Sequence, residues 1–84
     1  MVSLVITPDA QEQFKGLPKT VRASIMVVLE RLARWPEVSG AKPLRGVMSG
    51  SYRIRTGDYR VIFRVHADVI TVMRIGIRRD VYED

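Results

Sequence analysis

The chain has 84 residues, enough for one domain spanning residues 1–84 with a modest core, but too few for a second domain or a deep enclosed pocket. It has no cysteine and one histidine, His66, which excludes disulfides, thiolate zinc sites and histidine-rich metal centres, so we expect neither a metal nor a cofactor. No apolar run is long enough to span a membrane and no secretory leader is visible, so we expect a soluble cytoplasmic protein. The formal charge of +5 indicates that its partner is a polyanion.

The first residues predict a strand followed by a helix. Residues 2–6, VSLVI, are apolar and mostly β-branched, as is typical of a strand. Thr7 is a helix cap, Pro8 suits the first helical position because its missing N–H costs nothing there, and Asp9 suits the positive first turn. Gly16 is expected to end this helix.

A second helix is expected to follow after about two residues. Pro18 opens it and Pro36 ends it. The two helices should form an antiparallel hairpin whose apolar faces pack on a sheet. The apolar residues of the second helix recur at three- and four-residue steps, which predicts one buried face: Val21, Ile25, Val28, Leu29, Leu32 and Trp35.

The second half of the chain predicts a connecting loop and then three strands. Residues 36–50 hold two prolines and three glycines, typical of a loop, from which Leu44 is expected to insert into the core. Alternating residues then predict strands within 52–65 and 69–77, with turns at Gly57-Asp58 and at residues 66–68. The predicted fold is α+β: a short N-terminal strand, an antiparallel two-helix hairpin and a three-stranded antiparallel meander, with the helices on one face of the sheet.

The alternation divides the predicted sheet into two chemically different faces. Residues 42–79 hold nine basic side chains but only two aspartates, a net charge of +7. If period two holds in the last strand, Arg74, Gly76 and Arg78 join the basic face, although a bulge in that strand would reverse this. The face expected to pack on the helices holds Tyr52, Ile54, Val61, Phe63 and Val65, and the opposite face holds Arg53, Arg55, Arg60 and Arg64.

Arginines gathered on one sheet face are suited to binding a nucleic-acid backbone. The planar guanidinium donates two parallel hydrogen bonds to a phosphate and stays charged at physiological pH. Tyr52, Tyr59 or Tyr82, if exposed, would stack on bases. The same arginines would stabilise the extra negative charge that develops when a ribose 2′-hydroxyl attacks the neighbouring phosphate.

Two stretches, LRGVMSGSYRIRTGDYRVIFRV and RIGIRRDVY, resemble the RelE/ParE superfamily of toxin–antitoxin toxins, and its RelE branch more than its ParE branch. The resemblance covers nearly the whole chain, since the strand, helical hairpin and meander follow in the family's order. It implies a toxin of a type II toxin–antitoxin system that cuts mRNA in the ribosomal A site and leaves a 2′,3′-cyclic phosphate. It also implies a cognate antitoxin that holds the toxin inactive in a hetero-oligomer.

The resemblance also implies roles for individual residues. Arg60 matches the family's phosphate-stabilising arginine, Arg78 the arginine after the last strand and Tyr82 the functional tyrosine, so these three form the expected catalytic set. Where many relatives carry a histidine that can act as general acid, this chain has Ile77. The expected RNA-binding residues are Arg45, Arg53, Arg55 and Arg79, of which Arg53 and Arg55 stand where well-known members have lysine.

Two other functions remain open from the sequence. A ParE-like toxin would block DNA gyrase by binding alone, without nuclease chemistry. A non-catalytic RNA-binding homologue would fit the lack of an evident general base, because arginine almost never releases its proton.

Overall fold

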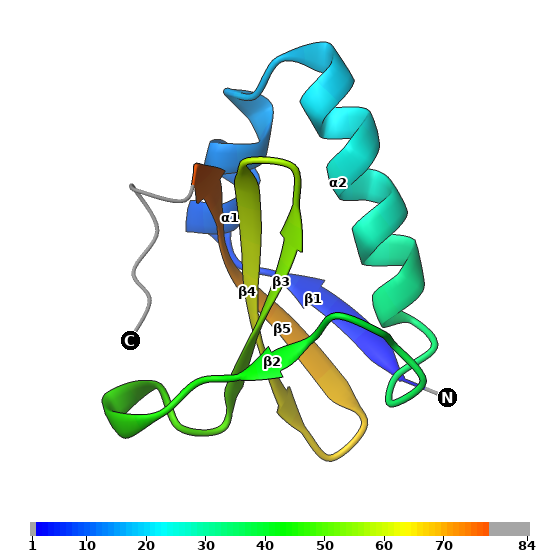
Figure 1. Cartoon of the computed structure of the whole chain (residues 1–84), viewed down its shortest axis with the longest axis vertical. Helices are drawn as coiled ribbons and strands as arrows, with labels where there is room; N and C mark the ends of the chain where they lie inside the picture. Colours follow the sequence, from blue (N-terminus) through cyan, green and yellow to red (C-terminus); the bar gives the residue numbers. More distant parts are fainter. Residues whose placement is uncertain (1, 78–84) are drawn as a thin grey trace.

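The structure is a computed structural model that describes residues 2–77, and it confirms the predicted α+β fold (Figure 1). Among these residues no helix is long and apolar enough to cross a membrane. The elements in chain order are β1 (Ser3–Ile6), α1 (Pro8–Lys15), α2 (Lys19–Leu32), β2 (Lys42–Pro43), a 3-10 turn (Gly46–Met48), β3 (Ser51–Thr56), β4 (Tyr59–His66) and β5 (Val69–Ile77).

Both helices begin where their sequence features predict. The Thr7 hydroxyl accepts a hydrogen bond from the Ala10 backbone N–H at 3.2 Å, Pro8 is the first helical residue, and Gly16 caps the C-terminus of α1. α2 follows Pro18 but ends at Leu32, so the predicted end at Pro36 was four residues late. Turns continue the chain from Leu32 to Pro36.

The sheet has five strands in the order β1-β5-β4-β3-β2. β3, β4 and β5 form the predicted antiparallel meander, and a tight turn at Gly57-Asp58, with Gly57 at φ +60°, joins β3 to β4. β1 pairs with β5 in parallel, which makes the sheet mixed. The prediction of a plain loop over residues 36–50 was wrong, because Lys42 and Pro43 pair with β3 as a two-residue edge strand.

The main core lies between the two helices and one face of the sheet. Ile54, Val61 and Phe63 are buried there against Ile25 and Leu32 of α2, as predicted, and Tyr52 and Val65 pack at its margin. The other face of the meander carries the basic side chains. The helices therefore leave this second face open to other contacts.

A bulge interrupts the alternation of residues along β5. Ile62 pairs with Arg74, but the next residue of β4, Phe63, pairs with Val72, so Met73 is the extra residue. The shift lets Val72 and Ile75, three positions apart, both face the core. Arg74 and Gly76 nevertheless lie on the basic face, as predicted for them.

Candidate nucleic-acid interface

The face of the sheet opposite the helices is called the arginine face, and it carries Arg53, Arg55, Arg60, Arg64 and Arg74. Residues directly opposite one another in an antiparallel ladder point to the same face, so the register defines rows across the sheet. One row holds Arg55, Arg60 and Gly76, and a second holds Lys42, Arg53, Ile62 and Arg74.

Arg60 is the most buried cation of the arginine face, with 2% of its surface exposed. It stands between Arg55 on β3 and Gly76 on β5, where the glycine contributes no side chain. A guanidinium away from water interacts more strongly with an anion than one in solvent, because the local dielectric is lower. Contact between Arg60 and a bound phosphate nevertheless requires the side chains around Arg60 to rearrange.

The remaining cations of this face are accessible. Arg55, Arg64 and Arg74 are exposed and Arg53 is half-buried. Arg45, which follows β2, is also exposed. No carboxylate occupies a position directly opposite any of the sheet arginines in the described ladders, so the register itself builds a positive surface.

A small apolar cluster interrupts this positive surface. Leu44 and Ile62 are buried there, with Met48 and Met73 packed against them. Leu44 is therefore buried as predicted, but on the arginine face and not in the main core between sheet and helices. The two methionines had no predicted role, because the position of Met73 depends on the bulge and that of Met48 on the loop.

Tyr52 and Tyr59 are not base-stacking residues of the arginine face. Both are half-buried at the margin of the main core, on the helix side of the sheet. The Tyr52 ring stacks on Phe63 with ring centres 5.7 Å apart and makes a T-shaped contact with Trp35 with ring centres 4.8 Å apart. The alternation that placed Tyr52 on the helix face was thus correct, and it removes the alternative of RNA stacking.

The end of β5 bears on the expected catalytic residues. Ile77 pairs with Tyr59 and so lies on the helix side of the sheet, not on the arginine face. Arg78, Arg79 and Tyr82 lie outside the described residues. Among the residues expected to be catalytic, the structure therefore places Arg60.

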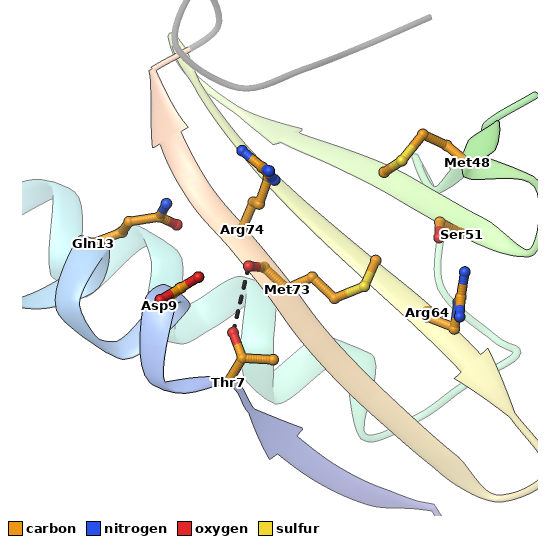
Figure 2. Close-up of a pocket in the computed structure, with 8 residues that line it drawn as sticks. All are labelled: Thr7, Asp9, Gln13, Met48, Ser51, Arg64, Met73 and Arg74. Atoms are coloured by element: carbon orange, nitrogen blue, oxygen red, sulfur yellow. Dashed lines mark hydrogen bonds between the residues drawn. The ribbon is translucent and has the colours of Figure 1, made fainter.

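A cavity of about 440 Å³ borders the arginine face where α1 meets β5. Figure 2 shows its lining, with side chains of α1 on one side and those of β3, β4 and the preceding loop on the other. Within residues 2–77 there is no group of three acidic, histidine or cysteine residues able to hold a metal ion. The lining residues are Thr7, Asp9, Gln13, Met48, Ser51, Arg64, Met73 and Arg74.

Comparison with known proteins identifies the family. Residues 4–82 match the family described as the ParE toxin of the type II toxin–antitoxin system parDE. The chain belongs to this toxin family. The match covers nearly the whole sequence and confirms the resemblance to the RelE/ParE superfamily.

Individual relatives carry RelE-type names. The chain is 29% identical over 79 residues to Toxin RelG of Mycobacterium tuberculosis, covering 90% of each protein. It matches a chain of the M. tuberculosis toxin–antitoxin complex RelBE2 with a TM-score of 0.80 and 25% identity, covering 92% of this chain and 98% of that one. The isolated RelE toxin of Escherichia coli gives a TM-score of 0.77 and 26% identity, with 92% and 84% covered.

Proposed function

We propose that this type II toxin is a ribosome-dependent mRNA endoribonuclease that needs no metal and inhibits translation. The observation that carries the proposal is the row formed by Arg55, Arg60 and Gly76 on the open face of the sheet. It places an exposed arginine, Arg55, directly opposite a buried one, Arg60, and arginine cations of this kind stabilise the charge that develops in phosphoryl transfer. The RelE-type names of the relatives favour mRNA over DNA gyrase as the target.

In the proposed reaction the ribose 2′-oxygen attacks the adjacent phosphorus and the bond from phosphorus to the 5′-oxygen breaks. The products are a 2′,3′-cyclic phosphate and a 5′-hydroxyl, so the proton lost by the 2′-hydroxyl balances the one gained by the leaving oxygen. Negative charge accumulates on the non-bridging oxygens in between. Arg60 is proposed to stabilise this charge, because a fixed, poorly hydrated cation acts more strongly than a solvated one.

The other cations are proposed to position the RNA. Arg53 and Arg55 would hold the backbone along the two rows, and Arg45 would extend the contact onto the loop after β2. Three further residues keep the roles that the resemblance implies, although they lie outside the described residues. Arg78 and Tyr82 complete the proposed catalytic set, and Arg79 adds to RNA binding.

A cognate antitoxin is the proposed partner of this toxin. Solved relatives include toxin–antitoxin complexes, RelBE2 of M. tuberculosis and RelBE of E. coli. By that likeness the chain would form a hetero-oligomer, in the cytoplasm, with an antitoxin whose acidic segment neutralises the arginine face. Such a contact would block RNA by charge complementarity alone.

The test is induction of the toxin in growing cells, followed by mapping of mRNA ends and detection of cyclic phosphate on programmed ribosomes. The wild-type chain is expected to stop translation and to produce cyclic-phosphate ends. Arg60→Gln, which removes the charge while keeping a polar side chain, should reduce cleavage by about 100-fold or more, as loss of one transition-state donor does elsewhere. Arg78→Ala should likewise relieve toxicity.

Arg34 gives the matched control, because it is an exposed arginine in the turn after α2, away from the arginine face. Arg34→Gln should leave cleavage unchanged. Intact mRNA under full growth arrest would overturn the proposal, and a DNA-damage response in its place would point to gyrase. RNA binding without any cyclic-phosphate product would identify a non-catalytic homologue.

A further inference from the structure

We infer that the cavity between α1 and the arginine face binds a nucleobase of the RNA, beside the phosphate held by the arginine rows. The inference rests on the proposed function, since it assumes that RNA lies on this face. The cavity would add a base-binding subsite to a face whose other proposed RNA contacts are arginines.

The cavity adjoins the proposed phosphate site. Arg74 belongs both to the cavity lining and to the row that contains Arg53. Two residues further along β5, Gly76 belongs to the row that contains Arg60. Two residues of an extended strand span about 7 Å, comparable with the separation of neighbouring nucleotides, so one RNA strand can reach both places.

Two methionines give the cavity an apolar surface. Met48 extends toward the sheet from the loop and Met73 extends across the sheet from β5 (Figure 2). Both pack against the buried cluster of Leu44 and Ile62. Their thioethers are polarisable and adaptable, so they can cover the face of a flat aromatic ring. A phosphate gains nothing from such a surface, whereas a base does.

Asp9 and Gln13 provide a matched hydrogen-bonding edge. They are four residues apart in α1, hence neighbours on one side of the helix, and both line the cavity. The Gln13 side-chain oxygen accepts the Ile75 backbone N–H at 2.7 Å, which leaves the amide NH₂ of Gln13 to act as donor. Beside it, the Asp9 carboxylate is an acceptor.

This donor and acceptor pair selects a base over a phosphate. The edges of nucleobases present donors and acceptors side by side, and carboxylates and amides are the side chains that read them. The negative charge of Asp9 disfavours a phosphate at this edge of the cavity. Arg64 and Arg74, which also line it, are placed to hold the phosphates on either side of an inserted base.

The buried hydroxyl of Ser51 also indicates that the cavity binds a ligand. The residue is 1% exposed and lines the cavity, and its hydroxyl has no hydrogen-bond partner among the described residues. Buried polar groups in native proteins almost always have a partner, so an unsatisfied one requires an explanation. A base that displaces the flexible Met48 side chain would provide that partner.

Methionine-methyl NMR tests the inference on the whole toxin without ribosomes. The chain labelled with ¹³C at the methionine methyl groups is titrated with adenosine or cytidine monophosphate. The Met48 and Met73 signals should shift and saturate, while Met26, exposed on α2 at 46%, should not move. Inorganic phosphate at the same concentration should leave Met48 and Met73 in place. Equal shifts with phosphate, or no shift with nucleotide, would overturn the inference.

Cleavage mapping separates this inference from the proposed function. In a toxin that cuts mRNA, Asp9→Asn should change the relative cutting at different codons by about fivefold or more, because one base-reading contact is worth that much. Exposed Glu30 on α2 provides the control, since Glu30→Gln should keep the wild-type pattern. An unchanged pattern in Asp9→Asn, with cutting intact, would reject the subsite. A wild-type chain that cuts nothing would reject the proposed function, and the nucleotide titration would still decide whether the cavity binds a base.

Discussion

Arg55 and Arg60 lie directly opposite one another across β3 and β4, with both side chains on the face that the helices leave open. Like charges in this relationship lower the stability of a sheet. A phosphate that contacts both guanidinium groups would offset this repulsion. Such a cost at one place in a small domain is typical of a functional site.

Replacing Arg55 by glutamate should make the chain more stable and less toxic. Arg55→Glu converts the like-charged pair with Arg60 into an opposite-charged one, which stabilises a sheet by about 0.2–1 kcal/mol. For a domain of this size the melting temperature should rise by about 1–8 °C. Thermal unfolding followed by circular dichroism gives the melting temperature, and growth arrest on induction measures toxicity.

Arg64 supplies the control for this experiment, because its in-register neighbours are Ser51 and Thr71 and carry no charge. Arg64→Glu has no like-charged pair to relieve, so the melting temperature should change little. A melting temperature for Arg55→Glu no higher than that of Arg64→Glu would contradict the repulsion between Arg55 and Arg60.

Binding of single-stranded RNA should depend steeply on salt and on individual arginines. Each phosphate contact on a single strand contributes about 0.7 to the slope of log affinity against log salt. Arg55→Gln should therefore lower that slope by about 0.7. Fluorescence anisotropy at several salt concentrations measures it, and Arg34→Gln should reproduce the wild-type slope.

Tyr52 should affect stability but not RNA binding. Its ring packs between Trp35 and Phe63 on the helix side, so Tyr52→Phe should preserve both the fold and RNA affinity. Tyr52→Ala should lower the free energy of unfolding by about 2–3 kcal/mol, less than the loss of a fully buried aromatic, because the ring is half-buried. Urea unfolding measures this loss, and a weaker RNA affinity in the well-folded Tyr52→Phe variant would show that the Tyr52 hydroxyl contacts RNA.

The Gln13 side chain should slow hydrogen exchange at one backbone amide on the edge of β5. The Ile75 N–H donates to the Gln13 side-chain oxygen at 2.7 Å, beyond the four residues of β5 that β1 covers. Gln13→Ala should speed hydrogen exchange at Ile75, with a loss of about 0.5–1.5 kcal/mol for one hydrogen bond. Gln13→Glu keeps an acceptor oxygen and should retain protection, whereas fast exchange in both variants would mean that the contact does not persist.

Local features predicted most of the fold. Thr7, Pro8 and Gly16 specify the limits of α1 through backbone chemistry alone, and the alternation from Tyr52 to Val65 separates core from basic face without knowledge of tertiary contacts. The bulge at Met73, in contrast, could not be predicted from local sequence. It becomes visible only when Ile62 and Phe63 are matched to their partners on β5, because an extra residue leaves no local mark in a strand that is apolar on both faces.

Part of the candidate site was predictable, because the alternation along a strand determines which side chains share a face. Arg53, Arg55 and Arg60 follow from period two within neighbouring strands. Asp9 and Gln13 carried no such mark, because they reach the arginine face only where α1 crosses the edge of β5. The two-residue strand at Lys42 and Pro43 was missed because proline argues against a strand unless it lies at a sheet edge, as it does here.

The parallel pairing of β1 with β5 also has a consequence for synthesis. Ser3–Ile6 find their partners only at Val69–Val72, so the sheet cannot close while the intervening residues are still being translated. The first strand of a nascent chain therefore has no partner in the sheet until Val69–Val72 have left the exit tunnel. The sheet is completed only after translation has passed Val72.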